Sequence, residues 1–235
     1  MGAITLIVAA TMARLGIRLA RSSSIEARGA LREVLLLGGK AVVWGPGFLA
    51  VVASTLHAWK RDRDQGIEAL AQAGGFGARS WMAARAAVLA AWLVALCAAS
   101  TAVVVLAVVG ANPSAAPMIG AGLVPTGVFA LTASIVLSLL ASACLGPRSR
   151  PGGYALLAVV LFLPELLAPW TESLLGRDGT SIPALLSGLA HAARPASFDA
   201  GRAATCATLW LVLVTLLVGW CERAAASWSR SGVRR

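Results

Sequence analysis

The sequence predicts an all-α membrane protein, a polytopic helix bundle of about six spans with a cytoplasmic helix between the second and the third. Of the 235 residues, 58% are hydrophobic and only 13% are charged, whereas a soluble domain carries about 25% charged residues. Residues 86–147 contain no Asp, Glu, Lys or Arg, a run long enough for two crossings of roughly 20 apolar residues each. Because lipid cannot pair backbone polar groups, and the apolar runs do not alternate as barrel strands do, the crossings should be helices.

Six apolar segments are the expected spans. They cover residues 3–19, 41–59, 84–109, 122–145, 153–170 and 203–220. The first is weak because it contains Arg14 and Arg18, and the second contains Pro46 between two glycines. Turn-forming residues at 110–114 end the third span, and Pro125 lies near the start of the fourth.

The later part of the chain carries further signals. Pro151 and two glycines open the fifth span, and a short helix at residues 183–193 is expected in the long connection to the sixth. Tryptophans lie at span ends, as expected for rings anchored at the headgroup level; these are Trp59, Trp81, Trp170, Trp220 and Trp228. Because no repeat or change of composition interrupts the chain, we expect a single transmembrane domain over residues 1–235.

The basic residues predict the orientation of most spans. With the loop of residues 60–79 inside the cell, eleven Lys and Arg residues lie inside and nine outside. Six of those nine fall between Arg14 and Lys40, so the rest of the chain favours this orientation by eleven to three. Three alternatives account for the N-terminal region: the first span is unusual, residues 14–32 form an amphipathic helix on the membrane surface, or the protein has five spans and the opposite orientation.

Composition and spacing disfavour several classes of function. The net charge of +10 reflects basic residues that flank spans, and nucleic-acid binding is not expected because no basic stretch is interleaved with aromatics. The four cysteines lie in apolar runs without metal-ligand spacing, so we expect neither a disulfide nor a bound metal. His57 and His191 stand alone, and no Ser/His/Asp or carboxylate cluster predicts an enzyme.

Pro164 and Glu165 are candidates for a polar site inside a span. An ionised carboxylate such as Glu165 costs roughly 2.5–3.5 kcal/mol within a span on insertion scales, so it should face the bundle or a cavity. It either lines a substrate path or gate, or lies close enough to the outer end of the fifth span to reach the interface. Pro164 loosens the same helix, and freed backbone groups at that depth usually face protein or water.

Residues 60–75 form the most informative segment. A cluster of three basic and two acidic residues is followed by a glycine, a short amphipathic stretch and two more glycines. Ile67, Leu70 and Ala71 fall on one face at helical spacing. Two interpretations stand side by side: a helix parallel to the membrane on which a soluble partner can push, or a solvated loop with one helical turn.

This segment resembles the coupling region of the permease subunits of ABC type-2 exporters. In that family a charged cluster precedes Gly-[Ser/Thr]-Leu-Glu-x-Leu, and Gly66, Glu68 and Leu70 match this pattern. The Ser/Thr after the glycine is missing, and Gly74 stands where the family has a proline. The resemblance implies a coupling helix whose contacts with an ATPase subunit are made by Asp62, Arg63, Asp64, Gly66, Ile67, Glu68 and Leu70.

A narrower resemblance, over residues 44–170, is to the heme-exporter B subunit of cytochrome c maturation, a branch of the same superfamily. It rests on the charged cluster directly after the second span, on the basic turn at residues 148–150 followed by glycines, and on the Leu-Pro-…-Pro run at residues 161–169. The first 40 residues do not resemble that family's usual entry helix.

The resemblance implies a transport subunit rather than an enzyme. Two permease chains, identical or related, would pair in the lipid bilayer of the bacterial cytoplasmic (inner) membrane, and ATP-binding cassette subunits would dock on their cytoplasmic loops. This chain would bind no cofactor, and ATP would bind the partner, because the nearest phosphate-loop string, at residues 38–41, lacks the first glycine and the final Ser/Thr. The alternatives are an exporter of lipid, polysaccharide or drug, and a non-transporting membrane scaffold or assembly subunit.

Overall fold

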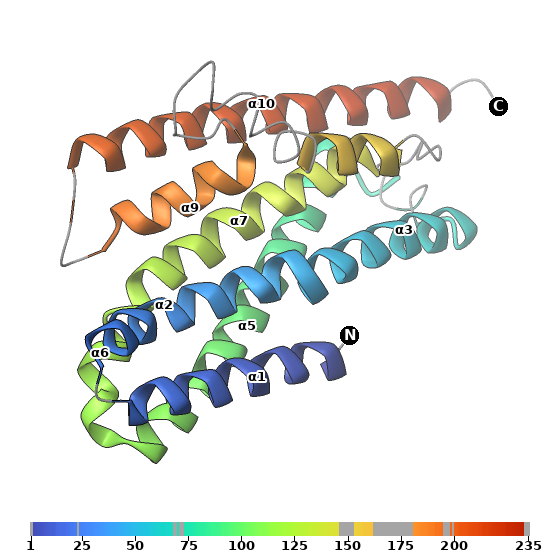
Figure 1. Ribbon diagram of the computed structural model, residues 1–235. Coiled ribbons are helices and arrows are strands. Elements are labelled where there is room, and N and C mark those ends of the chain that lie inside the picture. Colours follow the sequence, from blue (N-terminus) through green and yellow to red (C-terminus); the bar gives the residue numbers. More distant parts are fainter. Residues whose placement is uncertain are drawn as a thin grey trace. The chain divides into compact units, whose positions relative to one another are not determined.

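The computed structural model describes residues 2–22, 24–67, 70, 73–145, 153–161, 181–194, 198 and 200–232, and every regular element in these ranges is a helix (Figure 1). The α-helices are α1 (Gly2–Arg21), α2 (Ile25–Val42), α3 (Phe48–Asp64), α5 (Ala78–Ala111), α6 (Ala116–Gly120), α7 (Leu123–Cys144), α9 (Ile182–Ala192) and α10 (Ala200–Gly232). The π-helix η1 (Val43–Gly47) joins α2 to α3, and the 3-10 helix η2 (Pro113–Ala115) precedes α6. The predicted all-α class is confirmed for the described residues.

Five of the described helical stretches are long and apolar enough to cross a membrane. They are Gly2–Arg21, Gly29–Ala58, Arg79–Ala111, Leu123–Cys144 and Ala200–Arg223. These correspond to the first four and the sixth of the predicted spans. Of the fifth, only residues 153–161 are described, and these are helical, with Leu157 and Leu161 buried. The number of six spans therefore stays a prediction.

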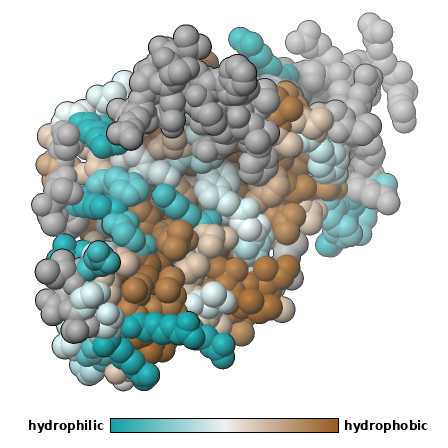
Figure 2. Space-filling model, in the orientation of Figure 1, coloured by the Kyte–Doolittle hydropathy of each residue, from teal (hydrophilic) through white to brown (hydrophobic). Residues whose placement is uncertain are grey.

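Much of the apolar surface of these stretches is exposed. In the most apolar part of Ala200–Arg223 only 11% is buried, and the corresponding shares are 22% in Gly2–Arg21 and 28% in Arg79–Ala111. Figure 2 shows hydrophobic side chains spread over the face in view. A water-soluble protein rarely exposes apolar patches of this extent, whereas lipid tails solvate them. These helices are compatible with a multi-pass membrane protein.

The chain divides into two compact units, each assembled from segments far apart in the sequence. Unit 1 comprises Met1–Phe48, Ala91–Ser134 and Leu186–Ala207, and unit 2 comprises Leu49–Ala90, Ile135–Leu185 and Thr208–Arg235. Each boundary falls within or at the end of a helix rather than in a linker. The single domain expected over residues 1–235 stays a prediction.

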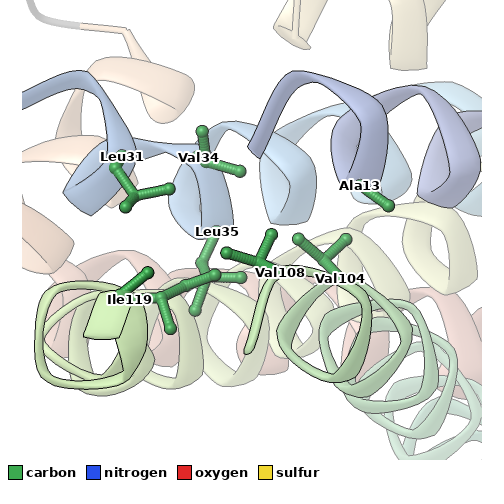
Figure 3. Packing of buried hydrophobic residues seen from close by; sticks show 8 residues of the cluster. Ala13, Leu31, Val34, Leu35, Val104, Val108 and Ile119 are labelled. Carbon is green, nitrogen blue, oxygen red and sulfur yellow. The ribbon is translucent and has the colours of Figure 1, made fainter. Parts of the chain in front are cut away.

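The core of unit 1 joins α1, α2, α5 and the η2–α6 turn. Leu35 of α2 lies between Val108 of α5 and Ile119 of α6, and Leu31 and Val34 pack beside it (Figure 3). Each of these five side chains is at most 2% exposed. Inside a membrane such contacts stabilise through close packing rather than through exclusion of water. The cluster therefore fixes the first half of α2 against the second half of α5.

The N-terminal region forms two helices with a break between them. Arg21 ends α1, and the Ser24 hydroxyl accepts a hydrogen bond from the Ala27 amide at 3.1 Å, which caps the start of α2. The Asn112 side chain donates to the Ala20 carbonyl at 2.7 Å and so satisfies an end group of α1. The alternative of a single surface helix over residues 14–32 is therefore wrong, because a capped turn interrupts it.

Pro46 of the second predicted span lies inside a continuous helical run. The helical run continues from Ile25 to Asp64, and the wider π-turn at Val43–Gly47 accommodates the proline, which has no N–H to donate. The apolar stretch begins at Gly29, twelve residues before the predicted start at residue 41. The longer stretch includes Glu33, an acidic residue that the sequence did not mark as intramembrane.

The short helix expected at residues 183–193 is confirmed as α9. The Ser181 hydroxyl accepts from the Ala184 amide at 3.1 Å and caps it. Within unit 1, Arg194 forms an ion pair with Glu33 at 2.5 Å, and the His191 Nε2 atom lies 4.0 Å from the same carboxylate. The Glu33 side chain is 42% exposed, so the pair stabilises the contact of α9 with α2 only modestly.

Close packing between α2 and the turn that precedes α7 gives a test of the fold. A Cβ added at Gly122 would lie 2.7 Å from the Arg32 carbonyl oxygen, whereas one at Gly120 would meet nothing within 4 Å. We expect Gly122→Ala to lower the free energy of unfolding by about 1–3 kcal/mol, because backbone must move. Gly120→Ala is the matched control and should change it by less than about 0.5 kcal/mol. Denaturant unfolding in mild detergent measures both, and equal stabilities would contradict the packing.

Candidate functional site

The segment of residues 66–75 lies between two glycines with left-handed backbone. The Gln65 amide donates to the Arg61 carbonyl at 2.9 Å, and Gly66, with φ +64°, then ends α3. The Leu70 amide donates to the Gly66 carbonyl at 3.1 Å, and the Gly74 amide donates to that of Leu70 at 2.9 Å. These are helical hydrogen bonds.

Gly75, with φ +81°, follows and closes the segment. Its described members Ile67, Leu70 and Ala73 are helical. A helical turn that starts after a glycine and stops at glycines is thus present, as the sequence predicts. Its place on the cytoplasmic side stays a prediction, and Glu68 and Ala71 lie outside the described residues.

The apolar side chains of this segment point to different surroundings. Ile67 is half-buried and lines a cavity of unit 2, whereas Leu70 is 71% exposed and Phe76, just beyond the segment, is 62% exposed. Two large apolar side chains beside a charged cluster are typical of a surface that a partner covers. The single apolar face expected for Ile67, Leu70 and Ala71 is therefore divided between the interior and the surface.

An ion pair between a buried carboxylate and a partly buried guanidinium ties the end of α3 to the start of α5. Asp62 is 7% exposed and pairs with Arg85. The Arg85 guanidinium also lies 5.3 Å from the centre of the Trp81 ring, which is one turn earlier in α5. The cation and the ring therefore attract each other, and the two helices that flank the 66–75 segment are held together.

The predicted coupling residues thus fall into different environments. Asp62 faces the interior, while Asp64, at the last position of α3, is exposed. The side chain of Arg63 lies outside the described residues. Arg85 is a residue of the candidate site that sequence reasoning missed, since we counted it only for orientation. The available signal was its i, i+4 spacing from Trp81 at the edge of a long uncharged run.

Two neighbouring cavities of unit 2 surround this ion pair. One, of about 460 Å³, has mainly apolar walls, and it is lined by Ser54, Thr55, Ala58, Asp62, Ile67, Trp81, Ala84, Arg85, Val88, Leu89 and Ser142. The other, of about 480 Å³, is lined by Ala53, Ser54, His57, Ala58, Arg61, Asp62 and Ile67. Because four residues line both, we call the two together the α3–α5 pocket. Its size falls within the range of small-molecule sites.

The remaining candidates of the sequence contribute less to a site. Pro164 and Glu165 lie outside the described residues. His57 lines the α3–α5 pocket, whereas His191 accompanies Glu33 in unit 1. In the ranges that the structure describes, no three His, Cys, Asp or Glu residues are grouped so that they could hold a metal ion.

Comparison with known proteins adds no assignment: no family model, no curated protein and no solved structure matches the chain.

The ion pair predicts a specific pattern of stability. We expect Arg85→Gln to lower the free energy of unfolding by about 3 kcal/mol, because it leaves the Asp62 carboxylate buried without its partner. The double variant Asp62→Asn, Arg85→Gln should lose less than the single one, since no charge is then stranded. Arg79→Gln, an exposed arginine of the same helix, is the control and should be nearly neutral. Additive losses in the double variant would contradict the coupling.

Proposed function

We propose that this chain is the membrane-spanning permease subunit of an ATP-driven ABC type-2 exporter in the bacterial cytoplasmic membrane. The chain would pair with a second permease subunit, identical or related. An ATP-binding cassette subunit would dock on the segment between α3 and α5. ATP hydrolysis would belong to that partner, and the role of this chain would be transport rather than catalysis.

One observation carries the proposal: the connection between two long apolar helices contains a short helical turn between two left-handed glycines, and it exposes two large apolar side chains. Leu70 lies within that turn and Phe76 directly follows its second glycine, in a connection that begins after five charged residues. A docking surface of this kind needs an apolar centre and a charged rim. Both are present, and the similarity of Gly66, Glu68 and Leu70 to the exporter motif supports an ATPase as the partner.

The ion pair suggests how force would pass from this surface to the membrane. The 66–75 segment begins where α3 ends and stops just before α5 begins. Asp62, near the end of α3, and Arg85, near the start of α5, join the two helices on either side of the segment. A partner that displaces the segment would therefore move α3 and α5 together rather than unwind one of them. Such rigid-body motion of packed helices is a common switching mechanism.

The cargo is the open part of the proposal. The candidate cargoes are heme, exported for cytochrome c maturation, and a lipid, polysaccharide or drug. Loss of c-type cytochromes on deletion of the gene would identify heme as the cargo. A membrane scaffold or assembly subunit is the candidate outside transport, and it predicts that no ATPase binds.

Co-purification tests the proposed partner. We expect an ATP-binding subunit to accompany the protein when it is purified in mild detergent from its own cells, and to be lost in Leu70→Arg and Glu68→Arg. The Leu70→Arg substitution replaces the apolar side chain at the centre of the docking surface with a charged one. Phe198→Arg is the matched control, because Phe198 is 65% exposed and is predicted to lie on the opposite side of the membrane.

The outcome separates the candidate functions. Retention of the ATPase in the control and its loss in the two segment variants supports coupling at residues 66–75. The absence of any ATPase from the wild-type preparation overturns the proposal in favour of the scaffold. Equal loss in all three variants would show that the arginine substitutions act through general damage, and the 66–75 segment would no longer be the docking site.

A further inference from the structure

The α3–α5 pocket lies where two apolar helical stretches end. Of its two walls, the apolar stretch that includes α3 ends at Ala58, and the one that includes α5 begins at Arg79. Ser54 and Thr55 of one helix and Val88 and Leu89 of the other lie inside these stretches. Asp62 and Arg61 follow the end of the first stretch within about one helical turn. The pocket therefore extends from the apolar layer into the interface.

The chemistry of the lining changes along this direction. On the membrane side it consists of small or apolar side chains, among them Ala84, Val88 and Leu89. Val88 is 69% exposed, so the apolar part of the pocket is open to the surrounding lipid rather than sealed. An occupant of this part must be apolar and can enter from the bilayer.

On the interface side the described lining carries an excess of positive charge. Two guanidinium groups, Arg61 and Arg85, and a single carboxylate, Asp62, line this part together with His57. The Arg61 Nε–H donates to the Gln65 Oε1 atom at 3.2 Å, which orients its exposed guanidinium. Because Asp62 is already neutralised by Arg85, an occupant with an anionic head is complementary to the remaining charge.

We propose that the α3–α5 pocket binds one anionic phospholipid, with an acyl chain against the Ala84–Val88–Leu89 wall and the phosphate near Arg61. A lipid joins the two properties that the lining demands, and basic pockets between membrane helices are suited to acidic headgroups. The inference goes beyond the proposed function, since lipid binding needs no ATPase. A bound lipid would fill the space beside the ion pair and support the junction of α3 and α5.

Native mass spectrometry of the detergent-purified, delipidated chain tests the proposal. The probes are dioleoyl phosphatidylglycerol, dioleoyl phosphatidylcholine and glycerol 3-phosphate. We expect one phosphatidylglycerol to bind at least about fivefold more tightly than phosphatidylcholine, which corresponds to about 1 kcal/mol for one arginine near the headgroup. Arg61→Gln should abolish this preference, and Ala84→Phe, which fills the apolar part, should reduce binding of both lipids.

Matched variants make the result specific to the pocket. Arg79→Gln removes an arginine at the same predicted depth that does not line the pocket, and Ala87→Phe adds a ring to an exposed position of α5 outside it. Both should bind lipid as the wild type does. Absence of any preference in the wild type, or equal effects of Arg79→Gln and Arg61→Gln, would overturn the proposal. So would unchanged binding in Ala84→Phe, or full competition by glycerol 3-phosphate, which would make it a site for free phosphate.

Discussion

The buried ion pair between Asp62 and Arg85 is the interaction on which the candidate site depends. Removing two charges from water costs several kcal/mol for each ion, so the pair persists only where geometry and neighbours compensate. Here Trp81 covers the cation, and the pair closes the gap between two apolar helices at their charged ends. The same contact fixes the ends of the 66–75 segment, shapes the pocket beside it and links any displacement of that segment to the spans.

The apolar helices set the second constraint. Because lipid gives helices no hydrophobic reason to associate, close packing and a few polar contacts must hold them together. Unit 1 meets this requirement with a tightly packed cluster around Leu35, a glycine at position 122 that permits backbone contact, and the bond from Asn112 to the end of α1. Other faces, above all along α10, are left apolar and exposed, as a chain surrounded by lipid or by further subunits requires.

Sequence reasoning predicted the helical class, the apolar spans and the glycine-bounded turn well, because each depends on composition or on local backbone preference. It failed where the structure depends on a contact between residues far apart in the sequence or on an unusual helical turn. Composition did not indicate the π-turn at Pro46, and it did not mark Glu33 as intramembrane, although Arg194 and His191 allow Glu33 to lie within a long apolar stretch. The spacing of Ile67 and Leu70 predicted a helix. It did not predict that Ile67 would line the pocket while Leu70 would be exposed. Arg85 was visible as a charge, but its pairing with Asp62 spans 23 positions and has no local signature.

The 66–75 segment is proposed to be a cytoplasmic contact surface, and its sidedness is the most direct test. A Leu70→Cys variant in a background with the four native cysteines replaced by alanine can be treated with a membrane-impermeant maleimide, with Phe198→Cys as the counterpart. The account predicts that Cys at position 70 reacts only after the cells are permeabilised, while Cys at position 198 reacts in intact cells. Labelling of position 70 in intact cells would contradict it, because no ATPase could then reach the segment.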